Sequence, residues 1–254
     1  AGAVASKYYE TDNYYEAGSA EAEAAAQWFG KTAERYGLDG QADGQAGEQA
    51  AERSEEAAQL EGTDREKRSA GAAGQTNSEK FEQIMEGYTP DGAKRMGHEV
   101  GGERRNRPGL DGTLNASKTA SIAAFVYGDK RIIEAHDKAV ATTLAIVEKN
   151  FAQTRVQVDG KMQTITGVDL IGRSFRHDTS RDLDPRLHTH CVMANMTQGK
   201  DGHWTALHND LIFENQKLIT EISRNAFERE VNAAGIATNR GRYGEVNIEG
   251  ISEH

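Results

Sequence analysis

The sequence lacks several features that would place it at once in a common protein class. It has a single cysteine, Cys191, which excludes a disulfide within these 254 residues. It has three prolines, and no apolar run approaches the roughly 20 residues needed to cross a bilayer. The opening residues, AGAVASKYYE, lack the basic start and apolar centre of a secretory signal. We therefore predict a cytoplasmic protein without membrane insertion.

An excess of basic residues, the usual mark of a nucleic-acid-binding surface, is also missing. The formal net charge is -10 at pH 7. The negative excess is concentrated near the start, because residues 1–80 contain 16 acidic and 8 basic side chains whereas residues 81–254 contain 24 and 22. A local basic groove is therefore compatible with the second part of the chain.

The length fits one domain, residues 1–254, built on one substantial core. Residues 41–80 are rich in Ala, Gly, Gln and Glu, and Leu60 is their one large apolar residue. Such a composition predicts a low-complexity acidic insert at about 41–80. No helicase domain is expected in this chain. Residues 167–174 resemble an ATP-binding loop only superficially, because Arg173 replaces the required lysine.

The hydrophobic periodicity predicts helices separated from a mainly antiparallel sheet. One helix is expected to begin at Ser19, include Trp28 and Phe29, and end at Gly37. Further helices are expected over 117–127, from a cap at Asp129 to Phe151, and over 209–234 with Gly235 as the stop. Residues 153–167 predict a hairpin that turns at Asp159–Gly160. The expected fold class is α+β.

A histidine cluster lies in residues 166–197, where two β-prone runs flank a polar loop centred near Arg181 and Asp182. Reflection through that centre places His177 opposite His188, and the strand period of two returns His190 to the same face. Three imidazoles can hold a divalent cation and leave positions open for a substrate. The alternative is that they are ordinary polar residues on a solvated sheet face. Cys191 should point to the opposite face, into the core.

Four of the eight tyrosines fall within the segment KYYETDNYYEAG: Tyr8, Tyr9, Tyr14 and Tyr15. They are flanked by polar residues rather than by apolar ones. One tyrosine of each pair could pack inward and leave its phenol hydrogen-bonded. A phenol beside a metal and a base has a second use, as a nucleophile that attacks a phosphodiester.

Together, five segments resemble the F-type conjugative relaxases of the HUH endonuclease superfamily. The segments are YYETDNYY, RPGLDGTLNASKT, GDKRIIEAHDKAV, RHDTSRDLDPRLHTHCVMANMT and DGHWTALHND, in the order of the family. The resemblance covers most of the chain outside the insert. It implies a palm-like fold with a central, mainly antiparallel sheet and flanking helices. It also implies an enzyme that nicks one DNA strand at a plasmid transfer origin through a 5′-phosphotyrosine intermediate.

The resemblance implies roles for single residues. The Tyr8–Tyr9 pair would supply the nicking nucleophile, with Tyr8 favoured, and Tyr14 or Tyr15 would act in strand transfer. The other implied site residues are His177, His188 and His190 as metal ligands, Asp111 as a carboxylate that orients a histidine or accepts the tyrosine proton, and Lys118 and Arg181 as phosphate contacts. Asp111 could instead be a turn residue, and Arg181 an ordinary surface arginine. The family's serine-alanine-proline-lysine-serine run appears here as residues 115–119, which keep the lysine but lose the proline.

The implied cofactor is a divalent metal ion. Mg²⁺ or Mn²⁺ is expected, and Zn²⁺ or another transition metal is the alternative, because Mg²⁺ prefers oxygen whereas imidazole suits the transition metals. The implied partners are single-stranded DNA or a transfer-origin hairpin, relaxosome accessory proteins and a type IV secretion coupling protein. Two other functions remain open: a rolling-circle replication initiator with the same chemistry, and a non-catalytic metal- or DNA-binding domain.

Overall fold

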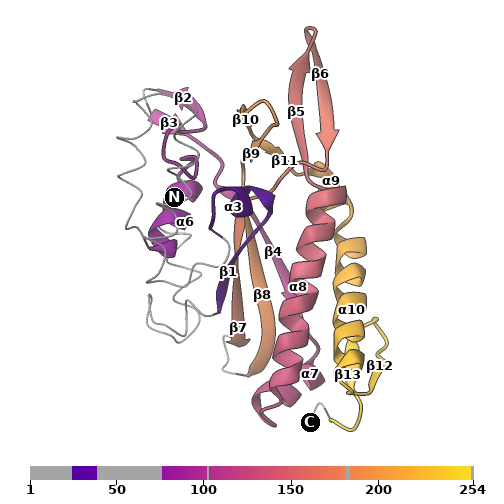
Figure 1. The fold of residues 1–254 in the computed structure, drawn as a ribbon. Coiled ribbons are helices and arrows are strands. Elements are labelled where there is room, and N and C mark those ends of the chain that lie inside the picture. Colours follow the sequence, from indigo (N-terminus) through magenta and orange to yellow (C-terminus); the bar gives the residue numbers. More distant parts are fainter. Residues whose placement is uncertain (1–24, 39–75, 102, 181–183, 253–254) are drawn as a thin grey trace.

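The computed structural model describes residues 25–38, 76–101, 103–180 and 184–252 (Figure 1). Its helices, in chain order, are α3 (Lys31–Arg35), α6 (Asn77–Met85), α7 (Lys118–Phe125), α8 (Lys130–Asn150), α9 (Asp210–Glu214) and α10 (Gln216–Ala233). The longer strands are β4 (Gly109–Asn115), β5 (Gln153–Val158), β6 (Lys161–Thr166), β7 (Gly172–Thr179) and β8 (Pro185–Ala194). The shorter ones are β1 (Ala26–Phe29), β2 (His98–Val100), β3 (Glu103–Arg105), β9 (Thr197–Gln198), β10 (Trp204–Thr205), β11 (Leu207–His208), β12 (Thr238–Arg240) and β13 (Val246–Ile248).

The largest sheet has four strands in the order β1-β7-β8-β4, and every neighbouring pair is antiparallel. Strand β8 is central, pairing with β7 on one side and with β4 on the other. Helices α8 and α10 lie side by side along the sheet, whereas α6 lies on the other side of it (Figure 1). This arrangement confirms the predicted α+β class.

The two faces of this sheet bury different partners because side chains alternate along each strand. On one face, Phe175 and Val192 pack in a cluster with Phe81 of α6. On the other face, Cys191 packs with Val140 and Leu144 of α8. The prediction that Cys191 is a core residue is therefore confirmed. The first of these faces also carries the histidines described below, beyond the part that α6 covers.

Several predicted helices are confirmed in the structure. Ser117 caps α7, its side chain accepting a hydrogen bond from the backbone N–H of Ala120, and Asp129 caps α8 in the same way through Arg131. The expected helix over 209–234 is divided into α9 and α10 at Asn215. The Asn215 side chain donates to the carbonyl of Leu211, which ends the first helix.

The predicted helix through Trp28 and Phe29 is confirmed only over α3 (Lys31–Arg35) and is wrong over Ala26–Phe29. These residues form strand β1, which pairs with β7 so that Trp28 lies opposite Arg173. The alanine-rich flank favours a helix locally, but the exposed edge of β7 offers backbone partners that only a strand can use. The short helix α3 follows, and the chain adopts positive φ at Gly37.

The expected insert at 41–80 ends earlier than the composition suggested. Thr76 begins helix α6 with a capping box, in which Thr76 and Glu79 satisfy each other's backbone N–H groups. Residues 77–80 therefore belong to the fold, whereas residues 41–75 lie outside the described residues. In the described ranges, no helix is both long and apolar enough to span a membrane.

Two hairpins extend from this body. The predicted one, β5–β6, turns at Asp159 and Gly160, both with positive φ, and projects away from the main sheet (Figure 1). The other, β12–β13, packs on the start of α7. There Ser117 Oγ donates to the Val246 carbonyl, and the Ile248 N–H donates to Thr119 Oγ1. This contact fixes the helix end that carries Lys118.

Candidate metal centre

Strand register brings the three predicted histidines together. His177 lies directly opposite His188 across the β7–β8 pair, and His190 follows two residues later on the same face. The ring centroids are separated by 5.1 Å for His177–His188 and His177–His190, and by 5.4 Å for His188–His190. The predicted convergence of the three rings is confirmed.

Two of the rings are oriented by partners outside the cluster. His190 Nδ1 lies 3.0 Å from a carboxylate oxygen of Asp111 and 3.3 Å from Thr113 Oγ1. His188 Nδ1 lies 3.0 Å from the backbone carbonyl of Arg186, to which it donates. Because Nδ1 of both rings is engaged, Nε2 is the atom of each ring available to a shared ion. This pattern of outer partners is typical of metal-binding histidines.

His188 favours the neutral imidazole, the form that binds metals. Burial lowers the pKa of His188, and the positive charges of His190 and Arg186 lower it further, against the opposing effect of its bond to the Arg186 carbonyl. His177 and His188 are 4% and 8% exposed, whereas the His190 side chain is 21% exposed. The cluster is therefore buried on the β7 side and open on the side of β4, an edge strand.

The donor set fits a divalent cation, since it offers three imidazoles with a carboxylate bonded to the back of one of them. In the described ranges, no group of three or more His, Cys, Asp or Glu side chains already forms a metal-binding cage.

The predicted phosphate contacts are placed only in part. Lys118 is the first residue of α7, three residues after Asn115, which pairs with His188. Its Nζ lies 3.8 Å from Asp184 Oδ2 in an exposed ion pair. Pairs of this kind contribute little to stability, so Lys118 can exchange Asp184 for another anion at small cost. Arg181 lies outside the described residues.

The predicted nucleophiles, Tyr8, Tyr9, Tyr14 and Tyr15, also lie outside the described residues. The strand that follows them is placed. The Ala25 carbonyl accepts a hydrogen bond from the N–H of Arg176, the residue next to His177. The described chain therefore begins at the histidine end of the sheet.

One polar residue near the cluster was not predicted to matter. His136 of α8 is 3% exposed, and its Nε2 lies 2.9 Å from Oγ1 of Thr189, the residue between His188 and His190. His136 lies on the buried face of its helix, with Ile132, Ala139 and Val140. Only the pairing of α8 with β8, which the sequence does not specify, identifies its partner.

A comparison with protein families matches residues 2–254 to the family described as TrwC relaxase. Among curated proteins, the chain is 33% identical over 261 residues to the multifunctional conjugation protein TraI of Escherichia coli strain K12, and 32% identical to a second E. coli TraI. The alignment covers 99% of this chain but 12% of each relative. The chain thus spans about an eighth of the length of the curated relatives it matches.

Solved structures of the relaxase TrwC are similar throughout the chain. A metal-bound complex with oriT DNA aligns with a TM-score of 0.73 at 32% identity, covering 99% of this chain and 73% of that one. A copper-bound complex with oriT DNA aligns with a TM-score of 0.74 at 30% identity over the same shares. A complex with a 27-mer that comprises the recognition hairpin and the cleavage site gives 0.70 at 30% identity, covering 99% and 72%.

Proposed function

Because this chain belongs to the TrwC relaxase family, we propose that it nicks one strand of a plasmid transfer origin and remains attached to the DNA through a tyrosine. The observation that carries this proposal is the convergence of His177, His188 and His190, with Asp111 bonded to the back of His190. The related TrwC structures are described as complexes with oriT DNA, one of them metal-bound. Family membership favours a relaxase over a replication initiator.

In the proposed reaction, the Tyr8 Oη attacks the scissile phosphorus. The P–O3′ bond breaks and the phenol proton leaves to solvent or a nearby base. The leaving O3′ takes up a proton from solvent, so the products are a free 3′-hydroxyl and a 5′-phosphotyrosine. The three histidines would hold a divalent cation, which when bound supplies positive charge beside the phosphate. Mg²⁺ or Mn²⁺ is our first choice, and Zn²⁺ or another transition metal is the alternative.

Other residues position the participants. Asp111 holds the His190 ring, and its bond to Nδ1 supports the orienting role rather than that of proton acceptor. Lys118, and Arg181 outside the described residues, would contact phosphates. Tyr9 completes the first tyrosine pair, and Tyr14 or Tyr15 would act in strand transfer. The proposed partners are a transfer-origin hairpin, relaxosome proteins and a type IV secretion coupling protein. The proposed location is the cytoplasm.

The test is covalent capture of DNA. The protein is incubated with Mn²⁺ and a labelled single-stranded transfer-origin oligonucleotide, and then separated on a denaturing gel. The wild type should give a labelled adduct, Tyr8→Phe should not, and His188→Ala should lose it as well. EDTA should prevent its formation.

Two outcomes would overturn parts of the proposal. An adduct that persists in Tyr8→Phe and disappears in Tyr14→Phe or Tyr15→Phe would move the nucleophile to the second pair. No adduct in the wild type, with DNA binding intact, would favour a non-catalytic DNA-binding domain.

A further inference from the structure

An arginine that the family comparison does not single out lies at the edge of the histidine cluster. Arg186 precedes His188 by two residues in β8, so its side chain leaves the same face of the sheet. It is exposed, and its Nη2 donates to Asn115 Oδ1 at 3.0 Å. Asn115 lies directly opposite His188 in the β4–β8 pair. The guanidinium is therefore held beside the ring of a candidate metal ligand.

The charge of Arg186 is not neutralised by the parts of the protein that the structure describes. Seven arginines in those parts have a carboxylate within ion-pair distance, as Arg131 has Asp129 and Arg240 has Glu228. Within the same ranges, Arg186 makes no ion pair, and its one side-chain hydrogen bond is to a neutral amide. The amide restrains the side chain without reducing its charge, and it leaves Nε and Nη1 to meet an anion.

We propose that Arg186 binds a backbone phosphate of the DNA strand, next to the phosphate held at the histidine cluster. This inference rests on the proposed function. The fork of an arginine donates two parallel hydrogen bonds to phosphate oxygens, and Asn115 orients that fork in advance. Lys118 lies nearby, but its ammonium group already forms an ion pair with Asp184. Of Lys118 and Arg186, both in the described ranges, Arg186 is thus the one that exchanges no ion-pair partner before it meets DNA.

The main chain of Arg186 serves a different purpose from its side chain. Its carbonyl orients His188, and a substitution of the side chain leaves that contact in place. This separation makes a clean test possible. Arg186→Gln should weaken DNA binding without weakening metal binding, whereas a variant that disturbed the cluster would weaken both.

The test measures binding of a fluorescent oligothymidylate by anisotropy, in Mn²⁺ and across a series of NaCl concentrations. Arg186→Gln should raise the Kd about five- to tenfold at low salt and make the slope of log K against log[NaCl] shallower by about 0.7, the value for one phosphate contact on a single strand. Arg186→Lys should keep the slope. Asn115→Ala should also keep it, because the charge remains, but should raise the Kd a few fold.

The control is Arg242→Gln, which removes an exposed arginine that stacks on Tyr243 in the turn of the β12–β13 hairpin and should change neither quantity. Mn²⁺ affinity, measured by calorimetry, should be the same in the wild type and Arg186→Gln. A Kd and slope in Arg186→Gln equal to those of the wild type would overturn the inference, and so would an equal loss of Mn²⁺ affinity.

The failure of this inference and that of the proposed function are distinguishable. If the wild type forms the covalent adduct but Arg186→Gln binds DNA as the wild type does, the phosphate contact alone is wrong. If the wild type forms no adduct but DNA binding depends on Arg186 as described, the contact stands and the nicking activity is wrong.

Discussion

The histidine cluster depends on residues outside it, and His136 is the most deeply buried of them. Burial lowers the pKa of His136 to about 3, and the charges of Arg176 and His188 act in the same direction. The ring is therefore neutral at pH 7 and remains so well below the ordinary histidine pKa. From the other face of the sheet, it holds Thr189 between two candidate metal ligands.

This burial predicts a specific loss of stability in acid. An unfolded histidine takes up a proton below about pH 6.5, whereas folded His136 does so only near pH 3, so the unfolded state binds more protons between these values. Stability should therefore fall as the pH drops below 6.5. In His136→Gln, the free energy of unfolding should fall by about 2 kcal/mol less between pH 7 and pH 5 than it does in the wild type.

Urea unfolding at each pH checks this expectation. His203→Gln, a change at an exposed histidine, is the matched control and should follow the wild-type curve. Parallel curves for the wild type and His136→Gln would show that His136 is not buried in its neutral form.

Single-residue predictions succeeded where one local rule was enough. The strand period and the mirror symmetry of a hairpin placed His177, His188 and His190 together, and the same alternation buried Cys191. The contacts between Asp111 and His190, and between Arg186 and Asn115, join β8 to β4 across more than 70 residues of sequence. A single sequence holds no signal for that register, so the first came from family resemblance and the second only from the structure.

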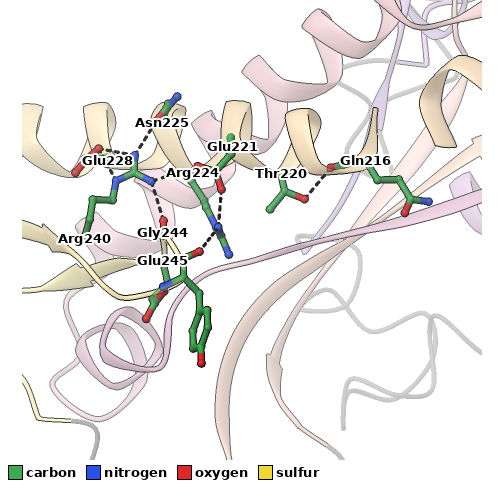
Figure 2. A network of polar contacts seen from close by, with 10 residues as sticks. Gln216, Thr220, Glu221, Arg224, Asn225, Glu228, Arg240, Gly244 and Glu245 are labelled. Carbon is green, nitrogen blue, oxygen red and sulfur yellow. Dashed lines mark hydrogen bonds and ion pairs between the residues drawn. The ribbon is translucent and has the colours of Figure 1, made fainter. Parts of the chain in front are cut away.

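The β12–β13 hairpin is held to helix α10 by a network of polar contacts (Figure 2). Arg240 of β12 donates to Glu228 and Asn225 of α10 and to the carbonyl of Gly244 within its own hairpin. Because the same hairpin packs on the start of α7, this network contributes indirectly to the placement of Lys118.

Removing the Arg240 side chain should loosen the hairpin. Arg240→Ala should lower the free energy of unfolding by about 1–2 kcal/mol, because several charge-assisted hydrogen bonds are lost together. Amide hydrogen exchange in β12 and β13 should accelerate. Arg229→Ala is the control: among the described residues, Arg229 pairs only with its neighbour Glu230, and its loss should cost less than about 0.5 kcal/mol. Equal effects of the two substitutions would contradict the role given to this network.

A second junction ties α8 to the start of α3 and to the segment that precedes β7. Oε1 of Glu148 accepts hydrogen bonds from the backbone N–H groups of Lys31, at 2.8 Å, and Leu170, at 2.7 Å. Burial raises the pKa of this carboxyl, against the opposing effect of those two bonds. One oxygen acceptor is therefore required here, and a negative charge is not.

The matched pair Glu148→Gln and Glu148→Ala separates these requirements. The amide oxygen of glutamine can accept both bonds, so its stability at pH 7 should equal or exceed that of the wild type. Alanine leaves two backbone donors unsatisfied and should cost about 2–4 kcal/mol in urea unfolding. A glutamine variant as unstable as the alanine variant would mean that the charge itself is needed.

Element prediction failed where partners decided the outcome. Residues 26–29 look helical among alanines but form a strand because β7 lacks another neighbour on that side. The start of α6 was assigned to a low-complexity insert, although Thr76 and Glu79 have the spacing of a capping box in the sequence. By contrast, α8 and the β5–β6 hairpin combine clear periodicity with a cap or a turn signal, and both were predicted closely.

For the molecule as a whole, the two faces of the sheet differ in role. One face packs against the long helices, and the other carries the candidate metal ligands. Helices α8 and α10 lie along one face, whereas α6 packs on part of the other face, which carries the histidines at one end (Figure 1). The net charge of -10 is no obstacle to DNA binding at that end, because a bound cation and Arg186 would provide positive charge where the strand passes.

We expect His177, His188 and His190 to bind one divalent cation together. Anomalous diffraction from crystals grown with Mn²⁺ tests it directly. We expect one strong peak between the three rings, with each Nε2 about 2.0–2.3 Å from it. A map without a peak at that position, at Mn²⁺ concentrations that support adduct formation, would contradict the account.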